Sequence, residues 1–124
     1  MNLLLDTHVV LWWRQNSPRI GSEARRAIGK ADRVFVSAAS AWEVAIKVAV
    51  GRLRLKDPFA ELVEQGGFEE LPIAFHHAGQ LQSLPLHHTD PFDRMLIAQA
   101  QAEKLTLVTH DRVVEPYDVP VLWI

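Results

Sequence analysis

The chain reads NLLLDTHVVLWW over residues 2–13, an apolar run that stops at an acid and is followed by a second apolar stretch. Residues 2–5 predict a short buried strand that ends at Asp6. Residues 9–13 then predict a short helix. A strand that leads directly into a helix is typical of α/β folds.

The same alternation continues to the C-terminus. Further strands are expected at residues 33–36, 68–73, 105–108 and 119–124, and further helices at 21–30, 38–51, 57–66, 78–84 and 90–103. Pro72 predicts that its strand lies at a sheet edge, because proline has no N–H to donate to a neighbouring strand. The Asp-Pro pairs at 57–58 and 90–91 are typical helix starts. The order predicts a single α/β domain over residues 1–124, with a mainly parallel central sheet of about five strands flanked by helices on both faces.

Composition excludes several classes of protein. The hydrophobic fraction of 48% is enough to build a core, and the absence of cysteine excludes disulfides, thiolate zinc sites and a cysteine nucleophile. The N-terminus has no basic leader, and no stretch approaches the roughly 20 apolar residues of a membrane span. We therefore expect a soluble, cytoplasmic protein that does not associate with membranes.

The net charge of −2 comes from 15 acidic and 13 basic residues, whereas nucleic-acid binders usually carry a basic surface. If four acids are gathered in one metal site, eleven remain against thirteen Lys and Arg, and the rest of the surface is slightly basic. The charge therefore neither supports nor excludes binding to RNA.

Four acids are expected at one edge of the sheet. Asp6 and Asp111 each end a predicted strand, Asp93 lies in the first turn of its helix, and Glu43 lies about two turns into its own. Strand ends and the starts of the helices that follow share one rim of a parallel sheet, where α/β proteins bind their ligands. We therefore expect the four carboxylates to converge.

Converging carboxylates repel one another unless a cation neutralises them. Ligands that are all oxygen suit hard cations such as Mg²⁺ or Mn²⁺. Such ions can lower the pKa of a water and stabilise the charge on a phosphodiester during displacement. The four acids thus predict metal-dependent hydrolysis without a protein nucleophile.

Each acid also suits an ordinary structural role. Asp6 can N-cap the next helix, and Asp111 can stabilise a turn. Glu43 can pair with the lysine four residues on, and Asp93 can complement the cap formed by Asp90. Only their joint position at one sheet edge favours a catalytic site.

Four segments carry a resemblance to a known family. They are LLLDTH (3–8), SAASAWEVAIK (37–47), DPFDRMLIAQA (90–100) and LVTHD (107–111), in family order and over nearly the whole chain. The sequence resembles the PIN-domain ribonucleases and, within them, the VapC-type toxins of bacterial toxin–antitoxin pairs.

The resemblance implies a PIN fold and an endoribonuclease that depends on Mg²⁺ or Mn²⁺ and leaves a 5′-phosphate and a 3′-hydroxyl. It also implies a homodimer and a cognate antitoxin that blocks the site. By position, the family's catalytic and metal-binding quartet falls on Asp6, Glu43, Asp93 and Asp111. Asp90 is a rival for the third place, but Asp93 stands seven residues before Ala100, as in the family's helix.

Three further residues are expected near the quartet. Thr109 falls on a family position that often carries a small hydroxyl residue, and Thr7 follows the first acid. Arg94 is interpreted as a phosphate contact or a structural contact.

Other polar and aromatic residues are interpreted as structural. The pairs His76-His77 and His87-His88 are expected on the surface or in loops, pointing in different directions. The four tryptophans are expected to pack in the core or in a dimer interface rather than to stack on bases. His110, beside Asp111, is a possible phosphate contact, and the basic residues at 52, 54 and 56 are as well explained by a solvated turn as by RNA binding.

Two other functions remain open from sequence. Another Mg²⁺-dependent phosphoryl-transfer or phosphatase domain could share the first strand's Asp, but a haloacid-type phosphatase needs a second Asp where His8 stands. A catalytically silent PIN-like protein-binding module would keep the fold without turnover.

Overall fold

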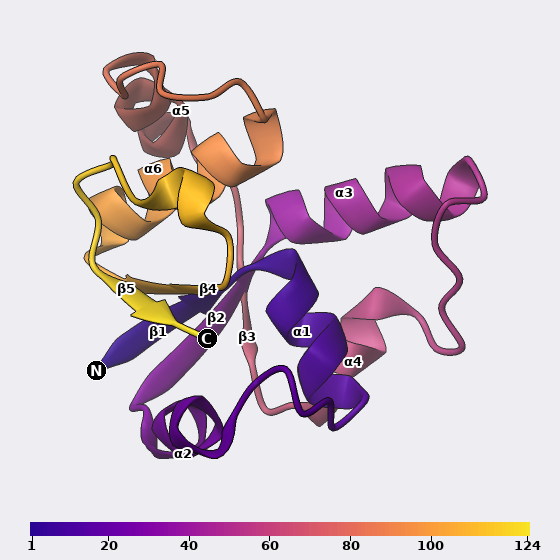
Figure 1. Ribbon diagram of the computed structural model, residues 1–124. Coiled ribbons are helices and arrows are strands. Elements are labelled where there is room, and N and C mark those ends of the chain that lie inside the picture. Colours follow the sequence, from indigo (N-terminus) through magenta and orange to yellow (C-terminus); the bar gives the residue numbers. More distant parts are fainter.

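A sheet of five parallel strands, in the order β3-β2-β1-β4-β5, runs through the computed structural model, which describes residues 1–124 (Figure 1). The strands are β1 (Asn2–Leu5), β2 (Arg33–Ser37), β3 (Glu69–Leu71), β4 (Thr106–Thr109) and β5 (Val121–Trp123). All five expected strands form, and the expected mainly parallel sheet is confirmed. The strand around Pro72 is an edge strand, as predicted.

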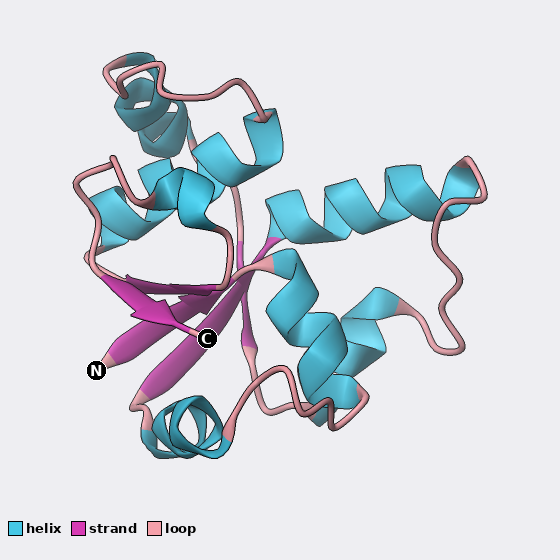
Figure 2. Cartoon of the chain, viewed as in Figure 1, coloured by secondary structure: helices cyan, strands magenta, loops and turns pink.

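Six α-helices and one 3₁₀ helix connect the strands and cover the sheet on both faces (Figures 1 and 2). They are α1 (Thr7–Arg14), α2 (Ser22–Lys30), α3 (Ala38–Ala49), α4 (Phe59–Gln65), α5 (Phe75–Gln82), α6 (Pro91–Glu103) and η1 (Arg112–Val114). None of them is long and apolar enough to span a membrane.

The central strand β1 divides the core into two halves. Leu3 and Leu5 face one cluster together with side chains of α1, α2 and α4, whereas Leu4 faces a second cluster with side chains of α6. All three leucines have no exposed surface, and burying each contributes roughly 1.5–3 kcal/mol. This is why the strand's apolar run is continuous rather than alternating.

The order of the strands reverses between β1 and β4. From β1 the chain continues outward to β2 and β3, then crosses back to place β4 and β5 on the other side of β1. In open α/β sheets such a reversal leaves a crevice beyond the carboxyl ends of the two strands. Asp6 and His110 are the first residues after those ends.

Three helix starts differ from the prediction. Helix α1 begins at Thr7 rather than at residue 9, because Asp6 caps it. Asp57 does not cap α4, which is preceded by Pro58 and has no side-chain cap; Asp57 instead lies 3.5 Å from Arg14 of α1. Helix α5 begins at Phe75 rather than at residue 78, because the side chain of His77 accepts the Ala74 N–H and thereby closes the first turn. The predicted stop at Gly66-Gly67 is confirmed, with Gly67 at a φ of 75° that favours glycine.

Candidate active site

Asp6 joins the end of β1 to the start of α1. Its Oδ1 accepts the backbone N–H of Val9 at 3.1 Å, so the predicted capping role is real. Its Oδ2 accepts the hydroxyl of Thr109 at the end of β4. The residue is 7% exposed, and burial raises the pKa of its carboxyl despite these hydrogen bonds. Asp6 is therefore both a helix cap and a buried acid at the sheet reversal.

Asp93 lies in the first turn of α6, as predicted. Asp90 is the helix cap: its Oδ1 accepts the N–H of Phe92 at 2.9 Å and of Asp93 at 3.0 Å. Burial and then, in decreasing order, the charges of Asp90, Asp111, Asp6 and Glu43 together raise the pKa of Asp93 to about 7. Asp93 therefore lies within electrostatic range of the other three members of the predicted quartet.

Glu43 is held on α3 by two neighbours. Thr7 Oγ1 donates to its Oε1 at 2.7 Å, and Lys47 Nζ donates to its Oε2 at 2.9 Å. Thr7 Oγ1 also lies 2.9 Å from Ser40 Oγ, which ties the start of α1 to α3. The predicted pair with the lysine four residues on is present, and it coexists with the position beside Asp93.

Asp111 lies beyond the end of β4. Its Oδ1 accepts the N–H of Val113 at 3.2 Å and caps the 3₁₀ helix η1, which agrees with the turn-stabilising role expected from the sequence. Its own N–H donates to Thr109 Oγ1 at 3.0 Å, and the same hydroxyl donates to Asp6. Thr109, only 1% exposed, therefore links two of the acids.

Arg94 does not reach toward the acids. Its guanidinium donates to the backbone carbonyls of Pro85 at 2.7 Å and Leu84 at 3.2 Å, and to Tyr117 Oη at 3.1 Å. Of the two roles expected for it, these contacts support the structural one.

We call Asp6, Glu43, Asp93 and Asp111 the acidic rim. Apart from Lys47 on Glu43, no Lys or Arg forms an ion pair with them. No three of them bring ligand atoms within 4.8 Å of one another. An oxygen-only donor set, partly buried and with an excess of negative charge, fits a hard divalent cation.

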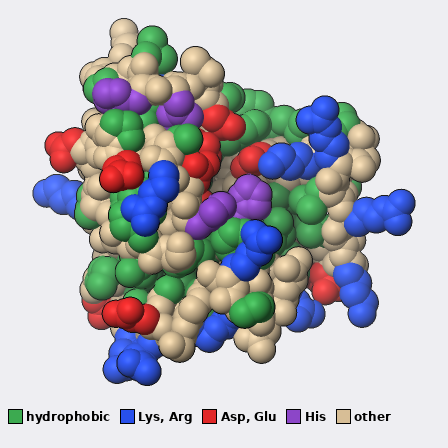
Figure 3. Space-filling model, viewed as in Figure 1, with side chains coloured by type: hydrophobic (Ala, Val, Ile, Leu, Met, Phe, Trp, Pro, Cys, Tyr) green, Lys and Arg blue, Asp and Glu red, His purple; other side chains and the backbone are tan.

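Aromatic rings lie beside the acidic rim. Trp12 and His110 are 4.8 Å apart between ring centroids, and His8 lies 5.7 Å from Trp12 and 5.8 Å from His110. The guanidinium of Arg19 lies 5.2 Å from the Trp12 ring. Figure 3 shows histidine and acidic side chains together near the middle of one face, where β1 ends and α3 and α6 begin. Sequence reasoning did not foresee this group, although His8 and Trp12 are four residues apart on one helix face.

The expected loop position of His87 and His88 is confirmed, whereas the prediction for His76 and His77 is wrong in part. His77 is buried at 1% exposure, and it does not diverge from His76: both Nε2 atoms contact Glu103 Oε2, at 2.8 and 2.6 Å. His77 Nδ1 accepts the N–H of Ala74, so the ring proton is on Nε2 and points at Glu103. A metal would need that nitrogen free, so this cluster is a set of hydrogen bonds and not a metal site.

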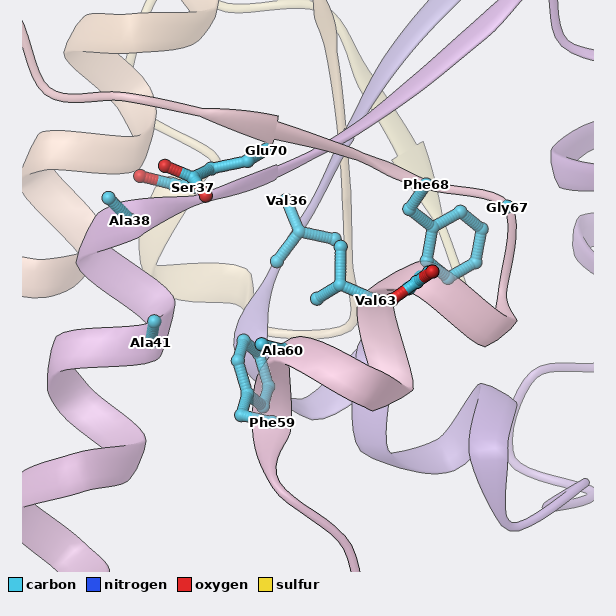
Figure 4. Close-up of a pocket in the computed structure, with 11 residues that line it drawn as sticks. Val36, Ser37, Ala38, Ala41, Phe59, Ala60, Val63, Gly67, Phe68 and Glu70 are labelled. Carbon is cyan, nitrogen blue, oxygen red and sulfur yellow. The ribbon is translucent and has the colours of Figure 1, made fainter.

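A groove of about 550 Å³ opens between α3, α4 and the β2–β3 edge (Figure 4). Phe59, Ala60 and Val63 line it from α4, and Ala38 and Ala41 line it from α3 (Figure 4). Along α3, Trp42 and Ile46 are also exposed, at 58% and 43%. This part of the surface is apolar and lies close to Glu43 in sequence.

Comparison with known proteins gives one consistent result. Residues 3–119 match the PIN domain family. The chain is 33% identical over 113 residues to Ribonuclease VapC22 of Mycobacterium tuberculosis, covering 89% of this chain and 87% of that protein. Its fold is similar to VapBC2 from Rickettsia felis bound to a promoter DNA fragment, with a TM-score of 0.72, 12% identity and 98% coverage of both chains. It is also similar to FitAcB from Neisseria gonorrhoeae, with a TM-score of 0.64, 22% identity and coverage of 97% and 96%.

Proposed function

The chain belongs to the PIN-domain family, and from this membership we propose that it is a metal-dependent endoribonuclease, the toxin of a toxin–antitoxin pair. One observation carries the proposal. At the sheet reversal, burial and the charges of the neighbouring acids, Asp111, Asp6 and Glu43 among them, raise the pKa of Asp93 to about 7. A divalent cation there would relieve that repulsion.

The residues that would hold Mg²⁺ or Mn²⁺ are the four acids of the rim. When bound, such an ion supplies Lewis-acid activation of a water and charge stabilisation on the phosphodiester. Thr109 and the Val9 N–H fix the orientation of Asp6, while Thr7 and Lys47 fix Glu43. The protein side of the mechanism is thus a set of oriented carboxylates, and the products would be a 5′-phosphate and a 3′-hydroxyl.

RNA is proposed as the substrate because the curated relative is named a ribonuclease. The rings of His8, Trp12 and His110 support this choice, since bases stack on aromatic side chains. Arg19, exposed over Trp12, provides a positive charge for a phosphate. The chain would work in the cytoplasm as a single domain.

The apolar groove supports a protein partner. The similar solved structures include a toxin–antitoxin complex from Klebsiella pneumoniae, with a TM-score of 0.67, 17% identity and coverage of 97% and 95%. Glu64 and Glu70 line the groove beside its apolar residues. A cognate antitoxin segment with apolar side chains and a basic residue would fit this groove. The homodimer expected from the sequence is a separate proposal.

The test is cleavage of a mixed pool of structured RNAs by the purified chain with Mg²⁺ or Mn²⁺. Wild type should cut, and both EDTA and Asp93→Ala should stop it. Glu61→Ala is the matched control, because Glu61 is an exposed acid of α4 with no ion pair. Full cleavage in excess EDTA would refute the metal mechanism, and a folded wild type that binds metal and cuts no RNA would favour the silent binding module.

A further inference from the structure

His88 lies next to the acidic rim but is not one of its acids. It precedes α6 by three residues, in the loop after α5, and its Nε2 lies 3.8 Å from Asp93 Oδ2. Nε2 is the one buried side-chain nitrogen or oxygen in the chain that has no hydrogen-bond partner. Buried polar atoms are almost always paired, so an unpaired one at a functional site requires an explanation.

The contacts of Tyr117 fix the protonation of the His88 ring. Tyr117 Oη accepts from Arg94 Nη1 at 3.1 Å and from the backbone N–H of His88 at 3.2 Å. With both acceptor positions used, its single hydrogen is left for His88 Nδ1, at 2.8 Å. Nδ1 is therefore an acceptor, and the neutral ring carries its proton on Nε2. The unpaired atom is a donor directed toward Asp93.

We propose that His88 is a positioning residue for the metal ligand Asp93. Its Nε2–H donates to Asp93 Oδ2 when that carboxylate binds the cation, and this bond sets the direction in which the other oxygen faces. Carboxylates that bind metals are commonly oriented by such outer hydrogen bonds. Arg94 takes part indirectly, because it holds Tyr117, which in turn sets the His88 tautomer.

This inference rests on the proposed function, since it requires Asp93 to be a metal ligand. It goes further by giving a role to three residues, His88, Tyr117 and Arg94, that lie outside the quartet.

The experiment measures Mn²⁺ binding by isothermal titration calorimetry, without RNA, for the full-length wild type and three variants. His88→Leu removes the donor, and its Mn²⁺ affinity should fall about 10- to 100-fold. His88→Gln places an amide N–H near the position of Nε2 and should restore most of the affinity. His76→Leu is the control, because His76 is an exposed histidine whose ring contacts Glu103 and His77 rather than Tyr117, and it should bind as wild type does.

Cleavage assays add a second readout. The Mn²⁺ concentration for half-maximal cleavage should rise in His88→Leu by the same factor, while the rate at saturating Mn²⁺ stays much closer to wild type. Unchanged Mn²⁺ affinity in His88→Leu would overturn the inference while leaving the nuclease intact. A wild type that binds no Mn²⁺ at all would instead refute the proposed function. If His88→Leu does not fold, His88→Gln is compared with His88→Asn, whose shorter amide does not reach Asp93. Equal Mn²⁺ affinities of these two variants would overturn the inference.

Discussion

Two clusters of titratable side chains in this chain differ in how their charges are satisfied. In the α5–α6 cluster, His76, His77 and Glu103 bring three ligand atoms within 4.8 Å of one another. Hydrogen bonds from the two histidines lower the pKa of Glu103. In the acidic rim the carboxylates are farther apart, yet burial and like charges raise the pKa of Asp93 to about 7.

The difference shows that close geometry alone does not identify a functional site. The α5–α6 cluster is compact because its charges and hydrogen bonds are complementary, so nothing further is required there. The acidic rim gathers like charges, and Lys47 on Glu43 is its one Lys or Arg partner. An unmet need for positive charge at a sheet reversal is the better indicator of function.

The largest expected effect is the loss of cleavage in Asp6→Asn. Asparagine keeps the shape of the side chain and is itself a good N-cap, so α1 should stay capped. Since a bound metal stabilises the transition state by several kcal/mol, the rate should fall about 100-fold or more. Cleavage is measured with saturating Mn²⁺ beside Glu103→Ala, which should cut as wild type does. Equal losses in both variants would mean that the two clusters do not differ in function.

The next effect is the stability of the metal-free protein as a function of pH. The folded-state pKa of Asp93, about 7, lies above its ordinary value of 3.8, so the folded chain binds more protons than the unfolded chain between these values. Stability should therefore fall as pH rises through that window, and the raised pKa of Asp6 acts in the same direction. The lowered pKa of Glu103 acts oppositely, and its contribution is lost only as pH falls below 4.5.

Asp93→Asn isolates this effect. It should stabilise the metal-free chain at pH 7.5 by about 1–2 kcal/mol, a figure reduced because the side chain is 30% exposed. At pH 5 the variant and wild type should be more nearly equal. The measurement is urea unfolding in EDTA at both pH values. If Asp93→Asn were less stable than wild type at pH 7.5, the charge of Asp93 would not destabilise the metal-free acidic rim.

An effect of similar size and opposite sign is expected for Glu103→Ala on stability. The substitution leaves the buried Nε2–H of His77 without an acceptor, which costs about 1–2 kcal/mol. Urea unfolding at pH 7.5 is the measurement, and His76→Ala, which removes only an exposed partner, is the control with a smaller loss. Unchanged stability would show that His77 is satisfied by other contacts.

The sequence predicted most of what positions the acidic rim, because the signals are local. The apolar run before Asp6, the Asp90-Pro91 helix start and the end of the strand before Asp111 can each be recognised within a few residues. Parallel topology then brings them together. The burial of His77 and the contacts of His88 were not predicted because they are not local. His88 contacts Tyr117, 29 residues away, from a loop whose path no periodicity describes. The same applies to the bond between Thr7 and Glu43, 36 residues apart.

The smallest expected effect concerns the rings of His8, Trp12 and His110, which would contact RNA without binding metal. His110→Ala removes one exposed ring and should raise the KM for RNA about three- to ten-fold, the lower part of the range for a single stacked base. The maximal rate should change little, because Asp111 keeps its own hydrogen bonds to Thr109 and Val113. Steady-state cleavage at saturating Mn²⁺ separates the two constants, with His87→Ala as the exposed histidine control. A fall in the maximal rate at constant KM would instead place His110 at the reacting phosphate. The acidic rim would then not be the only part of the site that acts in the reaction, and His110 would not serve only to stack on a base.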